Sequence, residues 1–260
     1  MNRYLMTNGA EHSEDLGPEL FFQLASPDRK RILVELQKED LHLNEIAKRL
    51  GMTPTEALRQ LQRMTEARLL EKMPNGSHRL TPYAKIVLDV SAPLDFLSQH
   101  REFFMSHDTS LIPIEYRARL AELSGTRIIP DTIGSMNAVA AMLKNAKSQI
   151  DCTIEVGSQV HLEIMRQRVT DGLKVRWLMQ ESFLPKARDF LGSVKKFPEM
   201  RKTDRLRVHI YMNEKEAAVS LRTISGPFDY AIFHGGDHQF LKWAGDMYAH
   251  EWERSKPWYP

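Results

Sequence analysis

The sequence predicts a two-domain α/β protein, with a small helical domain that carries a β-hairpin followed by a larger domain of alternating strands and helices. Three observations lead to this prediction. The chain has 260 residues, a length typical of two domains, and 42% of them are hydrophobic, enough for two buried cores. Two short amphipathic stretches and an Asn-Gly dipeptide lie between residues 41 and 80. From residue 116 onward, β-type apolar runs alternate with helical patterns.

Residues Leu41–Leu80 predict a helix-turn-helix followed by a β-wing. The first helix, Asn44–Leu50, has an apolar face and is followed by Gly51, where a left-handed backbone costs least. Thr53-Pro54-Thr55-Glu56 is a capping box that starts the second helix, which extends to about Ala67. The side chains of that helix predicted to face the core are Leu58, Leu61 and Met64.

The outer face of the second helix and the hairpin offer side chains for DNA contact. A helix in the major groove reads base edges, and basic side chains bind phosphates. Strands Leu69–Met73 and Ser77–Leu80 are predicted to flank an Asn75-Gly76 turn. The candidate DNA-binding residues are Thr53, Thr55, Glu56, Arg59, Gln60, Arg63, Lys72, His78 and Arg79. The predicted partner is therefore double-stranded DNA.

Charge and cysteine content narrow the function classes. A formal net charge of +2 is nearly balanced, so any nucleic-acid contact must come from a local patch. Within residues 20–85, twelve Lys and Arg face eight Asp and Glu, which places the positive excess in the candidate DNA-binding domain. The single cysteine, Cys152, excludes an internal disulfide framework and a CxxC metal site. Without a recognisable signal peptide or an apolar run of transmembrane length, we expect a cytoplasmic protein with no membrane partner.

This first domain resembles the winged-helix domains of prokaryotic MarR- and ArsR-type transcription regulators. Those families usually have glycine before the first wing strand, where this chain has Arg68, so we expect that corner to be built differently. Two further helices should come first, Pro18–Ala25 and Arg29–Lys38, the second of them capped by Ser26-Pro27-Asp28.

A connector follows the wing. Thr81-Pro82 should start a helix that ends near Ser91, Pro93 should interrupt it, and Leu94–Ser106 should form a further helix. Its apolar positions predict a dimerisation surface, and hence a homodimer that contacts two DNA half-sites. The expected organisation is a flexible arm at residues 1–17, the DNA-binding domain at 18–92, the connector at 93–115 and an α/β effector domain at 116–260.

Two histidines in the connector, His100 and His107, lie seven residues apart and hence on one face of a continuous helix. A metal site would need a third ligand, and none is evident nearby. The alternative is a pair of exposed or hydrogen-bonded histidines. We expect neither a metal nor a cofactor.

The second domain is predicted from its alternating pattern. The predicted helices are Tyr116–Leu123, Met136–Lys147, Gln159–Val169, Lys186–Lys195 and Gln239–Ser255. The predicted strands are Arg127–Pro130, Ile150–Val156, Leu173–Met179, Arg207–Tyr211, Ala217–Leu221 and Tyr230–Phe233. The alternation predicts a parallel sheet, to which a Glu214-Lys215 turn adds a hairpin, so that the sheet becomes mixed.

Nearly the whole chain, from Pro18 to about Arg254, resembles the archaeal methanogenesis-regulator family of winged-helix transcription regulators. The residues that carry the resemblance are His100-Arg101, His107-Asp108-x-Ser110-x-Ile112-Pro113, Asp171-Gly172-Leu173-Lys174-Val175-Arg176-Trp177, Asp229-Tyr230, Trp243 and Trp252. The resemblance implies a DNA-binding regulator whose effector domain is similar to half of a phospholipase D-like fold.

That fold raises a phosphodiesterase hypothesis, which the sequence disfavours. Phospholipase D-type enzymes need H-x-K, with histidine as the nucleophile and lysine holding the phosphate oxygens. No histidine in this chain has a lysine two residues later, and His209 is followed by Ile210-Tyr211. The G-x-S-x-G, Walker A and H-E-x-x-H motifs are missing as well. We therefore expect no catalytic residues.

A ligand in an open α/β sheet binds beyond the carboxyl ends of the parallel strands. The candidate ligand-binding residues are Glu155, Trp177, Glu181, Tyr211, Asn213, His234 and Trp243, with Ser158, Gln180 and Asp237 nearby. Each has a structural alternative, because tryptophans commonly fill cores and strand-end polar groups commonly cap helices.

Two functions remain open. The chain is either a regulator whose second domain senses a small polar or anionic metabolite, or a constitutive DNA-binding protein whose second domain only dimerises or recruits a protein partner. A closed pocket with converging polar groups would favour the first function, and a filled core would favour the second.

Overall fold

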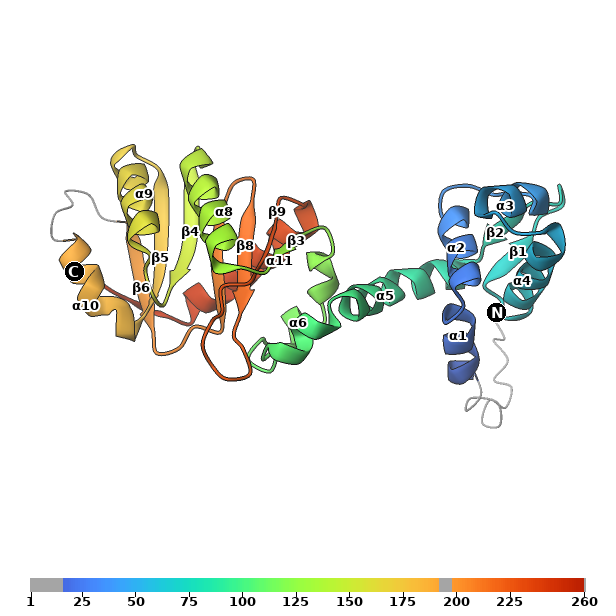
Figure 1. The fold of residues 1–260 in the computed structure, drawn as a ribbon, viewed down its shortest axis with the longest axis horizontal. Coiled ribbons are helices and arrows are strands. Elements are labelled where there is room, and N and C mark those ends of the chain that lie inside the picture. Colours follow the sequence, from blue (N-terminus) through green and yellow to red (C-terminus); the bar gives the residue numbers. More distant parts are fainter. Residues whose placement is uncertain (1–15, 192–197, 260) are drawn as a thin grey trace, which may run out of the picture. The chain divides into compact units, whose positions relative to one another are not determined.

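The structure, a computed structural model, describes residues 16–191 and 198–259 (Figure 1). The chain divides into two compact units, Met1–Ala92 and Pro93–Pro260. The first unit has one hydrophobic core and the second has two. None of the described helices is long and apolar enough to cross a membrane.

The first unit is a winged helix-turn-helix, as predicted. Its elements are α1 (Leu16–Leu24), α2 (Pro27–Leu36), α3 (Leu43–Leu50), α4 (Pro54–Glu66), the antiparallel strands β1 (Leu70–Lys72) and β2 (His78–Leu80), and the first part of α5 (Pro82–Gln99). Fully buried Ile32, Ile46 and Leu61 lie in its core. The predicted arm at residues 1–17 lies outside the described residues, except that Leu16 and Gly17 begin α1.

Caps and left-handed residues set the ends of these elements. Thr53 Oγ1 accepts a hydrogen bond from Glu56 N at 3.2 Å, and Glu56 Oε2 accepts one from Thr53 N at 2.9 Å, which closes the predicted capping box. Gly51 has the expected left-handed backbone, with φ 65°. Arg68 adopts the same conformation, with φ 56°. The corner before the wing therefore has the backbone that a glycine would give it, and Thr81 Oγ1 stabilises it by donating to Arg68 O at 2.7 Å.

The buried face of α4 differs from the prediction by one position. Ala57, Gln60, Leu61 and Met64 are buried, a helical stripe with spacings of three and four residues. Leu58, predicted to face the core, lies beside that stripe and is 44% exposed. Gln60, predicted to face outward, is only 8% exposed because it occupies a position within the stripe. Both predictions are wrong.

Helix α5 continues through Pro93, so the predicted interruption there is also wrong. A proline removes one backbone donor and crowds the carbonyl four residues back, which can bend a helix without ending it. Phe96, three residues later, is buried in a core of the second unit and stabilises the helix beyond Pro93. The break comes at His100, whose φ of −110° and ψ of 25° are not helical, and α6 (Arg101–Ser106) follows.

The second unit is built on one eight-stranded mixed sheet. Its helices are α7 (Ile114–Arg117), η1 (Leu120–Leu123), α8 (Thr132–Asn145), α9 (Gln159–Thr170), η2 (Glu181–Phe183), α10 (Leu184–Leu191) and α11 (His238–Glu253). Its strands are β3 (Arg127–Ile129), β4 (Gln149–Ile154), β5 (Lys174–Gln180), β6 (Glu199–Thr203), β7 (Val208–Asn213), β8 (Ala217–Leu221), β9 (Ile232–Gly235) and β10 (Lys256–Pro257).

The strand order in this sheet is β10-β6-β5-β4-β7-β8-β9-β3. Only β4, β5 and β6 are parallel to their neighbours in this group, and every other pairing is antiparallel. The prediction of a mixed sheet is confirmed, but the parallel part is smaller than the alternating pattern suggested. Strands β7 and β9 start at the edge of the sheet where β4 and β5 end.

Helices cover both faces of the sheet. Figure 1 shows α8 and α9 on one face and α11 on the other. Trp177 of β5 is fully buried in the core under α8, α9 and α10, and Trp243 of α11 is fully buried in the core on the opposite face. Both tryptophans therefore belong to the packing of the domain.

Strands β6 and β10 were not predicted. Strand β6 has the sequence Glu-Met-Arg-Lys-Thr, which lacks an apolar alternation, and β10 is a Lys-Pro pair at the edge of the sheet. Backbone hydrogen bonding to β5 and β6 places these strands, and such pairing leaves no signal in their own side chains. The predicted helix at residues 186–195 corresponds to α10, and its expected end lies outside the described residues.

Candidate DNA interface and ligand cavity

The outward face of α4 carries exposed cationic side chains. Arg59 and Arg63 are exposed, and within the described chain neither makes a hydrogen bond or an ion pair. Thr55, one turn before Arg59, is exposed on the same face, as is Lys72 on the wing. Gln62, which was not among the predicted DNA-binding residues, is also exposed on α4. These side chains can reach base edges and phosphates without first breaking an internal contact.

Two other candidates at the start of α4 already bond each other. Besides the two bonds of the capping box, Thr53 Oγ1 donates to Glu56 Oε2 at 2.8 Å. The hydrogen bonds from Thr53 lower the pKa of the Glu56 carboxyl, so the glutamate stays ionised. Their role in the structure is to fix the helix N-terminus, although both side chains are exposed.

Gln60 bonds inward, to a buried arginine. Gln60 Oε1 accepts from Arg29 Nη1 at 3.2 Å, and Arg29 also donates from Nε to Gln23 O at 2.9 Å and from Nη2 to Phe22 O at 2.6 Å. Arg29 is 4% exposed. This network ties α1, α2 and α4 together, so Gln60 orients the recognition helix and is not free to read a base.

The wing residues also depart from their expected positions. His78 is 7% exposed and burial lowers the pKa of its ring, which removes it from the predicted DNA-facing surface. Its backbone pairs with Leu41, in bonds of 2.8 and 3.2 Å. Arg79 is exposed, but its guanidinium is held by the carboxylate of Asp40, with Nη2 to Oδ2 at 2.6 Å. A phosphate contact by Arg79 would have to compete with that carboxylate.

The candidate ligand residues of the second unit lie at opposite edges of the sheet. Glu155, Gln180 and Glu181 follow the ends of β4 and β5. Asn213 ends β7, but β7 is antiparallel to β4, and Asn213 pairs with Ile150 near the start of β4. These residues therefore do not form one site.

Most of these polar groups have structural partners. Glu155 Oε1 and Gln180 Oε1 both accept from Arg222 Nη2, at 2.8 and 3.1 Å. Glu181 pairs with Lys202 at 3.1 Å. The remaining contacts are Asn213 Nδ2 with Met142 O at 2.8 Å, Asn213 Oδ1 with the backbone of Lys215 and Glu216, His234 Nε2 with Glu216 at 3.1 Å, and Asp237 Oδ1 with the first turn of α11. Trp177 and Trp243 are core residues on opposite faces of the sheet.

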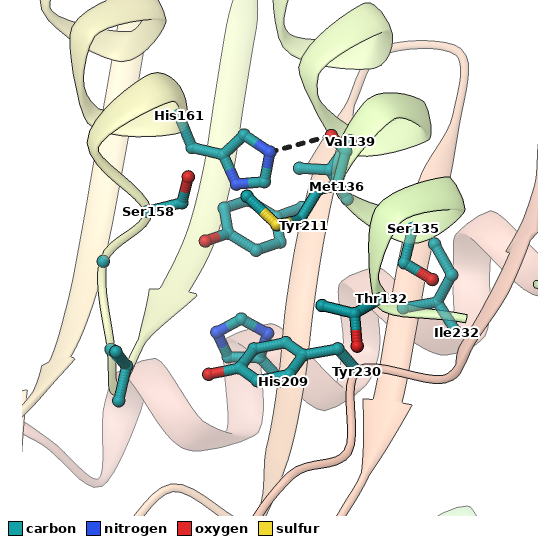
Figure 2. A pocket seen from close by; sticks show the side chains of 12 residues that line it. Thr132, Ser135, Met136, Val139, Ser158, His161, His209, Tyr211, Tyr230 and Ile232 are labelled. Atoms are coloured by element: carbon teal, nitrogen blue, oxygen red, sulfur yellow. Dashed lines mark hydrogen bonds between the residues drawn. The ribbon is translucent and has the colours of Figure 1, made fainter. Parts of the chain in front are cut away.

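A different site is present at the edge where β4 ends. A cavity of about 230 Å³ lies between α8, the loop after β4, the start of α9 and the first residues of β7. Figure 2 shows the rings of His161, His209, Tyr211 and Tyr230 around it. Of the candidate residues only Tyr211, together with the nearby Ser158, lines this cavity.

The imidazole and phenol groups of His209, Tyr211 and His161 in the cavity wall are buried and neutral. His209 and Tyr211 are each 5% exposed, yet neither side chain makes a hydrogen bond within the described chain. Burial lowers the pKa of His209 to about 3 and raises the pKa of the Tyr211 hydroxyl, so both are uncharged near pH 7. His161 donates from Nε2 to Met136 O at 2.9 Å, and burial lowers its pKa too.

Tyr230 adds backbone strain to the site. Its φ of 64° is left-handed, a conformation that residues with a bulky side chain rarely adopt. Such strain persists where surrounding structure enforces it, often at ligand sites. Burial raises the pKa of the Tyr230 hydroxyl, which is therefore neutral as well.

The segment that contains Tyr230 contacts the end of α6. His107 Nε2 lies 3.2 Å from Asp229 Oδ2, and the His107 ring stacks on Phe103 at a centroid distance of 3.7 Å. His107 Nδ1 donates to Phe103 O at 2.7 Å. His100 packs against Phe96 and Phe233 instead. The two connector histidines therefore point to different partners, and no three His, Cys, Asp or Glu side chains in the described chain could hold a metal ion together.

Residues 26–72 match the family model of the bacterial regulatory proteins of the arsR family. The match covers α2, α3, α4 and β1, the part of the first unit that forms the helix-turn-helix. Together with the winged-helix fold it supports a DNA-binding transcription regulator. The narrower resemblance, to the methanogenesis-regulator family, stays a prediction. No curated protein sequence matched the chain.

Several solved structures are similar to the chain. TrmBL2, an archaeal chromatin protein, is 13% identical over 94% of this chain and 100% of its own, with a TM-score of 0.44. Nuc of Salmonella typhimurium, a phospholipase D family member, is 8% identical over 52% of this chain and 98% of its own, with a TM-score of 0.41. The homodimeric winged helix-turn-helix domain Mb0332 of Mycobacterium bovis is 22% identical over 36% of this chain and 92% of its own, with a TM-score of 0.31. We draw no functional conclusion from similarities at these scores.

Proposed function

We propose that this DNA-binding regulator acts as a homodimer whose second unit senses a small ligand. The observation that carries the DNA-binding role is the outward face of α4, where Arg59 and Arg63 are exposed and unpaired within the described chain. Arginine on a recognition helix can bind guanine through two hydrogen bonds, and Arg63, further along the helix, is placed for a phosphate or a second base.

Dimerisation is supported by an apolar stripe on α5. Tyr83, Ile86 and Val90 are 46%, 64% and 64% exposed and follow one another at three- and four-residue spacing. The adjoining face of the same helix, with Ala84 and Val87, packs into the core of the first unit. An exposed apolar stripe on a helix is stabilised by burial against another surface. A second copy of the chain would supply it and would also double the DNA contacts.

The sensing role is supported by the cavity. It contains two buried polar side chains, His209 and Tyr211, that make no hydrogen bond within the described chain, which is more typical of a ligand pocket than of a filled core. Tyr230 in its wall is directly preceded in the sequence by Asp229, which contacts His107 at the end of α6. A ligand that alters the conformation at Tyr230 thereby acts on the segment that follows α5.

We propose no catalytic activity. The residues that line the cavity include no lysine and no carboxylate to act with His209, and Tyr211 stands where H-x-K would have lysine. The half phospholipase D-like fold expected from the sequence remains part of this proposal. The alternative, a constitutive DNA-binding protein, would need no such cavity.

DNA binding is tested by selecting duplexes from a random library with the full chain and measuring affinity by fluorescence anisotropy. We expect the Arg59→Ala, Arg63→Ala double variant to lose the selected sequence preference. Arg101→Ala, at an exposed arginine of α6, serves as the matched control and should bind as the wild type does. Equal affinity of the double variant and the wild type would refute the assigned interface.

Dimerisation is tested by sedimentation at micromolar concentration. We expect a dimer for the wild type and a monomer for Ile86→Asp, because a carboxylate on the stripe would have to be buried unpaired. Asp89→Asn, a change on the same helix outside the stripe, is the control. A wild-type monomer, with and without the selected duplex, would contradict the proposal.

A further inference from the structure

We propose that the cavity at the end of β4 binds an uncharged aromatic or heteroaromatic molecule of one or two rings that carries hydrogen-bonding groups. The inference rests on the sensing role proposed above and narrows its ligand class. It replaces the polar or anionic metabolite expected from the sequence by a neutral one.

The electrostatics of the wall favour a neutral ligand. The twelve residues that line the cavity include no lysine, arginine, aspartate or glutamate. The two histidines, His161 and His209, are neutral because burial lowers the pKa of both rings. Arg222, whose charge helps to lower the pKa of His209, is already bonded to Glu155, Gln180 and two backbone carbonyls. An anion would therefore be desolvated without a counter-charge, which is strongly unfavourable.

The shape of the wall favours a ring. His209 stands edge-on to Tyr211 at a centroid distance of 5.0 Å and to Tyr230 at 6.2 Å, and His161 stands edge-on to Tyr211 at 5.7 Å. Met136, Val139 and Ile232 supply the apolar remainder. Figure 2 shows the aromatic rings arranged around a common space. Rings of this kind bind another ring by stacking or edge-to-face contact.

The unpartnered atoms define the polar groups of the ligand. A neutral imidazole offers one donor and one acceptor, and a phenol hydroxyl offers both. The side chains of His209 and Tyr211 make no hydrogen bond within the described chain, and their polar atoms are not among its fully enclosed ones, so a ligand with a donor and an acceptor, such as an amide or a ring nitrogen, can bond them in place of water. A purely hydrocarbon ring would leave them unsatisfied.

The volume sets the size. An engineered apolar cavity of about 150 Å³ in another protein holds benzene. At about 230 Å³, this cavity has room for a ring with substituents or for a fused pair of rings. A nucleotide or a disaccharide would need considerably more space.

The test uses two pairs of isosteric probes on the full chain. Benzamide and nicotinamide are neutral at pH 7, whereas benzoate and nicotinate have the same shape and carry a negative charge. We expect both amides to bind at least tenfold more tightly than their carboxylates in ligand-observed NMR titrations. Carboxylates that bind as tightly as the amides, or the failure of both amides to bind at millimolar concentration, would overturn the proposal.

Variants locate the binding in this cavity. Tyr211→Phe removes one hydroxyl and keeps the ring, and Tyr259→Phe makes the same change at a tyrosine that is 80% exposed. We expect amide affinity to fall at least fivefold in Tyr211→Phe and to stay unchanged in Tyr259→Phe. Equal loss in both, or no loss in Tyr211→Phe, would overturn the assignment. His209→Phe should bind the amides more weakly still. If that variant does not fold, the comparison of amides with carboxylates on the wild type tests the proposal without it.

The outcomes separate this inference from the proposed function. If the carboxylates bind and change DNA affinity, sensing stands and the neutral ligand class is wrong. If no probe binds while Arg59→Ala still abolishes sequence preference, DNA binding stands and the cavity is not the sensor of a ring compound.

Discussion

Both candidate sites contain polar side chains that make no hydrogen bond within the described chain, but the surroundings of these side chains are opposite. On α4, Arg59 and Arg63 are exposed and charged, so water solvates them until DNA replaces it. In the cavity, His209 and Tyr211 are 5% exposed and neutral. The first arrangement suits a highly charged polymer bound from solvent. The second suits a small uncharged molecule that is enclosed.

The largest effects are expected for the tryptophans that the sequence suggested as ligand walls. Because Trp177 and Trp243 are fully buried in the two cores of the second unit, Trp243→Ala should reduce its free energy of unfolding by about 3–5 kcal/mol, and Trp177→Ala by a similar amount. Tyr211→Phe, in the cavity wall, should change it far less. Urea denaturation measures all three. A small loss of unfolding free energy for either tryptophan variant would mean that the core tolerates the missing side chain. That tryptophan would then again be a candidate for ligand binding.

Neighbouring residues of α4 should separate DNA affinity from stability. Arg59→Ala should weaken binding to the selected duplex by about 1–3 kcal/mol without changing thermal stability. Gln60→Ala should instead destabilise the first unit by about 1–3 kcal/mol, because buried Arg29 Nη1 loses its partner. Anisotropy and thermal denaturation give the two readouts. The same pattern of effects in both variants would contradict the division between an outward arginine and an inward glutamine.

The burial of His209 should make the second unit sensitive to acid. In the unfolded chain His209 binds a proton near pH 6.5, but in the folded chain it does so only near pH 3. Between these two pH values the unfolded state holds more protons, so the free energy of unfolding rises with pH. Below pH 6.5, His209 should lower the free energy of unfolding by up to about 1.4 kcal/mol per pH unit. His161, shifted in the same direction, contributes in parallel.

The contribution of His209 is isolated by measuring the free energy of unfolding against pH and comparing its slope in the wild type and in His209→Phe. His238→Phe, at an exposed histidine, is the control and should keep the wild-type slope. Identical slopes for the wild type and His209→Phe would contradict the prediction that folding lowers the pKa of His209.

The smallest effect is expected on the wing. Asp40→Asn removes the carboxylate that holds Arg79, so the guanidinium becomes available for a phosphate. Binding to selected and random duplexes should strengthen equally, and the slope of log affinity against log salt should steepen by about one. Asp89→Asn, at an exposed acidic residue of α5, is the control and should leave the salt slope unchanged. An unchanged salt slope would mean that Arg79 lies away from the DNA backbone.

The two sites also differed in how much of them the sequence could reveal. The helix-turn-helix was predictable because its signals are local: a capping box at Thr53, a left-handed Gly51 and an outer face with helical spacing. Gln60 was placed wrongly because its partner, Arg29, is 31 residues away along the chain. A polar residue is expected outside unless such a distant partner is known.

The cavity was missed because it depends on strand direction. The prediction considered the carboxyl ends of strands, as is appropriate for a parallel sheet. His209 and Tyr230 lie at or just before the starts of β7 and β9, and those strands run opposite to β4, so their starts meet its end. Asn213 and His234 were assigned to the wrong edge for the same reason. Strand direction follows from long-range pairing, which side-chain periodicity does not encode.

The central claim is that a neutral ring in the cavity changes how the first unit binds DNA. The most direct test is the Kd of the full chain for its selected duplex, measured by anisotropy with and without saturating benzamide or nicotinamide. Coupling of about 1–3 kcal/mol, a change of roughly five- to 150-fold in Kd, is typical of such regulators. We expect a change in this range for the wild type and for Tyr259→Phe, and none for Tyr211→Phe at the same probe concentration. An unchanged wild-type Kd with the amide demonstrably bound would contradict the account.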